Sequence, residues 1–296
     1  MFVMIKNDYP LISCLILNWN KKNETLQCLD SVNKQNYPNI EIVLIDNCSD
    51  DGSTETIIKT YPNIKLIKLD KNYGCPGGRN KGIEYCSGEF IFFCDNDGIL
   101  HRDAIRNAIE CISKSKDIAI VTGLVKNFET ESEIDTKYDL SNPKCMETNL
   151  FQGGVSLHRK SIYSEVGFYP SDYMYGGEET YLSYLVLDAG YKIFKSDQVI
   201  LWHKNVSSFE NNEIKTIQKW TNAFMNAYQL YPVEYFLIYT LYFFTFYPYL
   251  AFKKGYLTPY LKSIRYYFKR LKNYKRNPVK RKTYKRFRKL KKGNNL

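Results

Sequence analysis

Two aspartates separated by a single residue follow directly after the apolar run 90–94. They are Asp95 and Asp97, with Asn96 between them. Carboxylate oxygens are hard ligands that suit Mg²⁺ or Mn²⁺, and such ions are often held by substrate phosphates as well. A pair of this kind also occurs by chance after strands, so the motif alone gives only a hypothesis of a divalent-metal site.

Polar, small or acidic residues also follow three earlier apolar runs. Each segment has a structural interpretation, because Asp, Asn, Ser and Gly favour turns and helix N-caps, and a glycine run can be a tight loop. The guanidinium of Arg79, beside the glycine run, suits a diphosphate. Four such segments together favour a ligand-binding site over a set of turns and helix caps with a purely structural role. The three segments are 18–20, with Asn18 and Asn20; 46–53, with Asp46 and Asp50; and 72–80, with Gly74–Gly78 and Arg79.

Short apolar runs alternate with segments of helical spacing over the first half of the chain. The alternation predicts βαβ units in an α/β fold with a Rossmann-like, mostly parallel sheet flanked by helices. Ligands bind such sheets at the carboxyl ends of the strands, where the four polar segments should meet. The expected strands are 11–17, 41–45, 65–69, 90–94 and 118–122, and the expected helices are 25–36, 50–60, 80–86 and 103–113.

The second half of the sequence is less regular. Residues 126–150 are polar and predict a long surface loop, and 178–189 predicts a helix that Gly190 ends. Strands are expected at 151–157, 191–194 and 199–202, and an amphipathic helix at 213–231.

Charge divides the chain into an acidic body and a basic tail. From Lys253 onward there are 18 Lys and Arg and no Asp or Glu, so the 252 preceding residues carry a net charge of −7. A single nucleic-acid-binding domain would be basic throughout its body, so nucleic acid is not the expected partner. The aromatic stretch 235–252 precedes the tail, and it contains Pro248 and many Tyr. We expect this extension to attach to an anionic membrane surface, with a packing helix plus disordered tail, or a true membrane span, as alternatives.

The eight cysteines are scattered and form no C-x-x-C pair. No secretory signal is recognised at the N-terminus, so we expect reduced thiols and a cytosolic compartment.

Taken together and in order, these segments resemble the family 2 glycosyltransferases, which have the GT-A fold. The resemblance extends over roughly residues 10–210. It is carried by 15–20, 45–53, 72–83 and 93–97, and further on by 176–182, 190–193 and 202–204.

The resemblance implies an inverting enzyme that moves a sugar from a nucleotide-diphosphate sugar to an acceptor hydroxyl with the help of Mn²⁺ or Mg²⁺. It implies that Asp46 recognises the nucleotide base, with Asn18 and Asn20 nearby and Asp50 in the same loop as Asp46. Arg79 would support the loop or contact the diphosphate, and Asp95 and Asn96 would face the nucleotide-sugar. Asp97 would bind the metal, and His203 resembles the histidine that completes the metal site in some members; packing against Trp202 is its alternative. His101 and His158 match nothing and are expected at the surface.

The acidic helix-start motif departs from the family pattern. Glu178 and Glu179 stand where the family has Glu-Asp, while Tyr181 and Leu185 replace a later Asp and Arg. We expect Glu179 to be the catalytic base, with Glu178 as the second candidate.

The expected organisation is a catalytic domain over 1–210 and a helical, membrane-associating basic extension over 211–296. The acceptor would be a cell-surface glycan or a lipid-linked saccharide, and the enzyme would lie at the inner face of the cell membrane. Two other classes remain as alternatives: a nucleotidyltransferase-like protein, although its glycine-rich signature is missing after the first strand, and a protein that binds nucleic acid through the tail.

Overall fold

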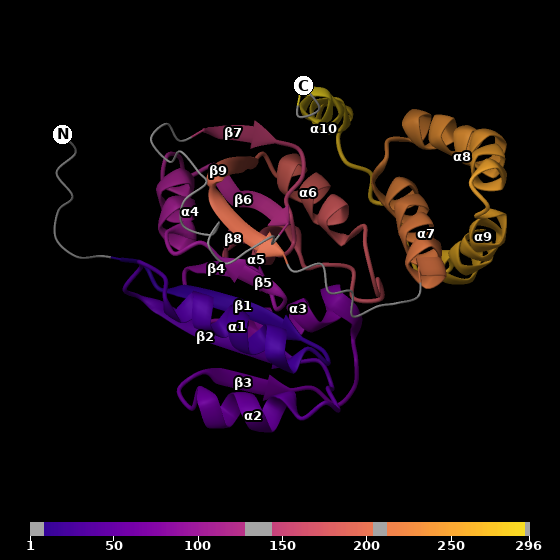
Figure 1. Cartoon of the computed structure of the whole chain (residues 1–296). Coiled ribbons are helices and arrows are strands. Elements are labelled where there is room, and N and C mark those ends of the chain that lie inside the picture. The colour runs from indigo at the N-terminus through magenta and orange to yellow at the C-terminus, as the bar shows by residue number, and fades with distance from the viewer. Residues whose placement is uncertain (1–8, 128–143, 204–211, 294–296) are drawn as a thin grey trace.

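The computed structural model describes residues 9–127, 144–203 and 212–293. A nine-stranded sheet runs through the body, with helices on both faces and a group of helices at one side (Figure 1). The strands are β1 (Ile12–Asn18), β2 (Ile40–Asp46), β3 (Lys65–Lys68), β4 (Phe90–Asp95), β5 (Gly98–Leu100), β6 (Ile118–Asn127), β7 (Cys145–Thr148), β8 (Val155–Arg159) and β9 (Lys192–His203). The helices are α1 (Lys22–Asn33), α2 (Ser53–Thr60), α3 (Gly74–Tyr85), α4 (Ala104–Ile112), α5 (Ile162–Val166), α6 (Glu178–Asp188), α7 (Asn212–Leu230), α8 (Val233–Lys253), α9 (Leu257–Leu271) and α10 (Arg281–Gly293).

The strand order is β3-β2-β1-β4-β8-β6-β9-β5, with β7 paired to β9. The first four strands are parallel, and their registers align Asn18 with Asp46 and Leu17 with Asp95. Their carboxyl ends therefore meet at one edge, as the alternating pattern predicts. The sheet becomes mixed beyond β4, because β8 is antiparallel to both β4 and β6.

The strands in the second half of the chain differ from those that the sequence predicts. The two strands expected at 191–194 and 199–202 are one strand, β9, and the strand expected from 151 begins at Val155. The short strands β5 and β7 were not expected, since three or four residues give too little periodicity. The loop expected over 126–150 is largely outside the described residues, but its two ends lie in β6 and β7.

The glycine run is helical rather than a loop, because α3 begins at Gly74. Its glycines bring the helix against the sheet. A Cβ at Gly78 would lie 2.5 Å from Leu17 Cδ1, and one at Gly82 would lie 2.4 Å from Leu15 Cδ1. Close packing, and not turn formation, therefore explains the two glycines that face β1.

Both unmatched histidines are buried, contrary to expectation. His158 on β8 is completely buried among Phe93, Phe151 and Tyr163, and burial holds its pKa well below the usual value. His101 is 7% exposed. A polar residue in a strand of the central sheet is covered when both faces of that sheet carry helices.

The expectation of reduced thiols is wrong for one pair, since Cys111 and Cys145 form a disulfide between α4 and β7. The other six cysteines are thiols.

The C-terminal extension is helical and packs against the body (Figure 1). On α10, Phe287 stacks on Tyr184 of α6 with ring centroids 3.9 Å apart, and Arg286 pairs with Glu147 of β7. The tail is thus not a disordered segment over the described residues. The boundary expected between 210 and 211 lies outside the described residues, so the division into two domains stays a prediction.

Candidate active site at the carboxyl edge of the sheet

A cavity of about 890 Å³ opens at the carboxyl edge of the parallel strands. We call it the site cavity. It lies between the ends of β1 and β4 on one side and the starts of α3, α6 and α7 on the other. The structure brings seven of the expected site residues together in its lining: Arg79, Asp95, Asn96, Asp97, Glu178, Glu179 and His203.

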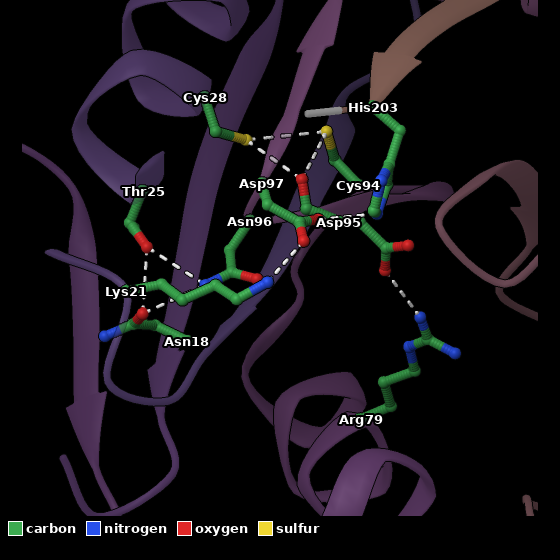
Figure 2. A network of polar contacts seen from close by, with 10 residues as sticks. All are labelled: Asn18, Lys21, Thr25, Cys28, Arg79, Cys94, Asp95, Asn96, Asp97 and His203. Carbon is green, nitrogen blue, oxygen red and sulfur yellow. Dashed lines mark hydrogen bonds and ion pairs between the residues drawn. The ribbon is translucent and has the colours of Figure 1, made fainter. Parts of the chain in front are cut away.

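Asp97 is the centre of a charged cluster. It is 6% exposed, its Oδ1 lies 3.0 Å from His203 Nε2, and its Oδ2 pairs with Lys21 Nζ (Figure 2). The short pairing of β5 with β9 aligns Gly98 with His203 and so places the histidine beside the aspartate. Burial opposes ionisation of Asp97, but the hydrogen bonds from His203 and Lys21 outweigh it and lower its pKa. The same contact with Asp97 raises the pKa of His203.

The donor set suits a divalent cation. One ligand atom from each of Asp95, Asp97 and His203 lies within 4.8 Å of the others. Two carboxylates and an imidazole are ligands that Mn²⁺ accepts, and Asp97 already pairs with the Lys21 ammonium and the His203 imidazole. The residues therefore fit a metal, which would compete with the Lys21 ammonium for Asp97.

Arg79 connects helix α3 to the group formed by Asp95, Asp97 and His203. Its Nη2 donates to Asp95 Oδ1 over 3.0 Å, while its buried Nη1 has no hydrogen-bond partner among the described residues. Gly153 and Gly154 cover this pair, because a Cβ at Gly153 would lie 2.4 Å from Arg79 Nη1 and one at Gly154 would lie 1.9 Å from Asp95 Oδ2. An unpaired guanidinium nitrogen beside the cavity is a candidate contact for an anionic ligand.

Asn18 holds three strand ends together from a completely buried position. Its amide nitrogen donates to Asp46, and its Oδ1 accepts from Thr25 over 2.8 Å and from Asn96 over 3.0 Å. Asp46 is also fully buried, and Ser49 and other neighbours saturate its oxygens. Asn18 and Asp46 therefore fix the end of β2 and the loop 46–53 that follows it.

Asn20, in the loop after β1, and Asp50, in the loop after β2, both lie outside the cavity lining. The Asp50 backbone nitrogen donates to Asn20 Oδ1 over 2.9 Å, and both residues are exposed. Asn20 has a φ of +51°, which asparagine tolerates better than most residues. Their role in donor binding stays a prediction.

The two glutamates at the start of α6 differ in environment. Glu178 is 3% exposed, and its Oε2 has no hydrogen-bond partner among the described residues. Burial, with a contribution from the neighbouring Glu179 charge, raises the pKa of Glu178 to about 8. Burial also raises the pKa of Glu179, against the opposing charge of Arg79.

Helix α7 of the extension holds the segment that carries these glutamates. Asn222 donates to the carbonyl of Gly176 over 2.7 Å, and Asn226 donates to the carbonyl of Gly177 over 2.7 Å. Both glycines have positive φ, at +76° and +92°. The extension therefore fixes the backbone turn that places Glu178 and Glu179 at the cavity.

Several cavity residues were missed in the sequence. Lys21 directly follows the segment 18–20 and Asn47 lies within the segment 46–53, so the polar residues beside them were the available signal. Gly153, Gly154 and Lys219 come from segments distant in sequence, and nothing local connects them to the strand ends.

The sequence model of glycosyl transferase family 2 matches residues 13–164, which is more than half of the chain. The chain belongs to this family. Its resemblance to family 2 glycosyltransferases is thereby confirmed, as is the expectation that it is an enzyme of the glycosyltransferase class.

Curated relatives agree with this assignment. The chain is 26% identical to glycosyltransferase AglE of Haloferax volcanii over 205 residues, which cover 66% of this chain and 67% of that protein. It is 27% identical over 186 residues to a poly-beta-1,6-N-acetyl-D-glucosamine synthase of Staphylococcus epidermidis, covering 57% and 45%. It is 26% identical over 151 residues to the succinoglycan biosynthesis protein ExoO of Rhizobium meliloti, covering 48% and 43%. The chain thus spans less than half the length of the last two relatives.

Solved structures show the same fold. A mannosyltransferase of Pyrobaculum calidifontis, in complex with GDP-Man and Mn²⁺, has a TM-score of 0.59 at 18% identity, covering 74% of this chain and 64% of that one. GalNAc-T7 with UDP, GalNAc and Mn²⁺ has a TM-score of 0.61 at 16% identity, covering 77% and 49%. The expected GT-A architecture with a helical C-terminal extension is confirmed.

Proposed function

We propose that this glycosyltransferase moves a sugar from a nucleotide-diphosphate sugar to an acceptor hydroxyl with inversion, using a divalent metal. The observation that carries the proposal is the cluster of Asp95, Asp97 and His203 in the site cavity at the carboxyl edge of the sheet. The fold neighbours from P. calidifontis and the GalNAc-T7 structure contain Mn²⁺ with a nucleotide or nucleotide-sugar, which supports the same ligand class here.

Asp97, His203 and Asp95 would hold the metal, and the metal would neutralise charge that develops on the diphosphate leaving group. Arg79 supports this role from the side, because its paired nitrogen orients Asp95 and its unpaired nitrogen can meet a phosphate oxygen. Hydrogen bonds from Asn18 to Asp46 and from Asn96 to Asn18 would hold the ends of β1, β2 and β4 together beneath the donor. The bond between Asn20 and Asp50 links the loops that follow β1 and β2.

Glu179 is our candidate for the general base that takes the acceptor proton. It is less buried than Glu178 and lines the same cavity. Glu178, with a pKa of about 8, holds its proton at neutral pH, so little of it is available there as a base and it can donate a hydrogen bond to a ligand oxygen.

We further propose a saccharide or lipid-linked saccharide acceptor and a location at the cytoplasmic face of a membrane, with residues 1–210 as the catalytic domain and 211–296 as the attaching extension. One helix of the described residues, α8, is long and apolar enough to cross a membrane. The named roles of the S. epidermidis and R. meliloti relatives in glycan synthesis support a glycan acceptor.

The proposal is tested by a thermal-shift screen of UDP-, GDP- and dTDP-sugars with and without Mn²⁺. A ligand at 100 times its Kd should stabilise the fold by about 2.7 kcal/mol. We expect one nucleotide class to raise the melting temperature only when Mn²⁺ is present. Equal stabilisation without metal would overturn the metal role, and no stabilisation by any donor would overturn the donor class.

A further inference from the structure

Helices α8 and α9 expose large apolar side chains on their outer sides. Figure 1 shows the two helices at one side of the molecule, with α7 between them and the body. Eight of these side chains are more than half exposed, and we call them the docking face. They are Val233 (58%), Leu237 (60%), Ile238 (64%), Leu241 (66%), Tyr249 (59%) and Phe252 (72%) of α8, and Leu261 (56%) and Phe268 (57%) of α9. Large apolar side chains exposed on two neighbouring helices favour an interaction site.

The inner sides of the same helices are fixed to α7. Phe243 of α8 and Tyr267 of α9 pack on Phe224 of α7, with ring centroids 4.2 Å and 4.3 Å away. Tyr260 of α9 donates a hydrogen bond of 2.7 Å to the Phe243 carbonyl. A membrane-crossing α8 would have to leave these partners, so the packing favours a helix that lies along a surface.

Charge identifies the occupant of the docking face. Glu234 is the last acidic residue of the sequence, and exposed Lys253, Lys254, Arg265 and Lys269 follow the apolar side chains along α8 and α9. A second copy of the chain would bring two basic faces together, which is unfavourable. An anionic lipid leaflet instead offers acyl chains to the apolar side chains and phosphates to the basic ones.

We propose that the docking face inserts into the acyl boundary of an anionic leaflet, with α8 and α9 in the membrane plane and their basic residues at the headgroups. Membrane attachment is thereby assigned to α8 and α9 and not to the whole basic tail, because Phe287 and Arg286 hold α10 on the body. Helix α7 then connects the membrane-facing helices to the site cavity. Phe224 of α7 contacts α8, while Lys219, five residues earlier, lines the cavity. The cavity lies one helix away from the leaflet, where a lipid-anchored acceptor can reach it. This last step rests on the proposed transferase function; the docking does not.

The test is co-sedimentation of the full chain with vesicles of phosphatidylcholine alone or with a quarter of phosphatidylglycerol. The variant is Leu241→Glu, which places a charge in the docking face without touching its inner contacts. The matched control is Ile58→Glu on α2, where the replaced side chain is 51% exposed. Figure 1 shows α2 at the opposite end of the molecule from α8 and α9. We expect the chain and the control to bind the anionic vesicles and Leu241→Glu to bind at least tenfold more weakly, with an unchanged melting temperature.

Three results would overturn the proposal. The first is undiminished binding by Leu241→Glu. The second is a lipid-free dimer that Leu241→Glu dissociates, which would make a second copy the occupant. The third is binding that survives alkaline carbonate, which would make α8 a membrane span. Donor binding measured on the same Leu241→Glu sample separates this proposal from the catalytic one, because the site cavity contains no residue of the docking face.

Discussion

Replacement of Glu178 by glutamine should make the protein more stable at pH 8 and change it little at pH 5. The carboxyl is 3% exposed, and its pKa is raised from 4.5 to about 8 in the folded state. A raised carboxyl pKa means that the folded state holds the proton more tightly than the unfolded state. The free energy of unfolding that Glu178 contributes is therefore lost as the pH rises from about 4.5 to about 8.

The size of the effect follows from the shift. Each pKa unit corresponds to about 1.36 kcal/mol. The difference in the free energy of unfolding between Glu178→Gln and wild type should therefore grow by about 3 kcal/mol from pH 5 to pH 8. For a chain of this length, that gain should raise the melting temperature by roughly 6 °C. Calorimetry of wild type, Glu178→Gln and the exposed control Glu84→Gln across this range measures it. A difference between Glu178→Gln and wild type that does not grow with pH would refute the assignment of a buried, neutral Glu178.

Three further predictions concern the site. Glu179→Gln should keep donor binding and lose transfer by roughly 10²–10⁴-fold, as expected for a general base, in a single-turnover assay; loss of donor binding would contradict this role. Lys21→Met should raise the affinity for Mn²⁺ by about fivefold in calorimetric titration, because the metal no longer displaces an ammonium from Asp97; weaker binding would show that Lys21 assists the metal. Asp46→Asn should lower the free energy of unfolding by about 1–3 kcal/mol in chemical denaturation, because it breaks a buried hydrogen-bond network, and should weaken donor binding; an unaltered loop and donor affinity would remove its role.

The parallel part of the sheet was predictable because each apolar run is bounded by turn residues and followed by a helix-spaced segment. The meeting of Asp95, Asp97 and Asn18 at one edge follows from parallel topology alone. The proximity of His203 to Asp97 does not, since it depends on the three-residue strand β5, which has no detectable period in the sequence.

The remaining differences also have physical reasons. Gly74–Gly78 suggested a loop because glycine disfavours helices, but contact with Leu17 of β1 outweighs that intrinsic preference. The attachment of α7 and α10 to the body depends on side chains far apart in sequence, such as Asn226 with Gly177 and Phe287 with Tyr184. No local pattern encodes such pairs.

The central claim is that Asp97 holds a metal that binds the donor diphosphate. It is tested most directly by calorimetric titration of UDP and GDP into wild type, Asp97→Asn and the surface control Asp30→Asn, each with and without Mn²⁺. We predict that wild type and Asp30→Asn bind one of the two nucleotides at least tenfold more tightly with Mn²⁺, and that Asp97→Asn loses this gain while its melting temperature shows an intact fold. The same Mn²⁺-dependent gain in Asp97→Asn would contradict the claim.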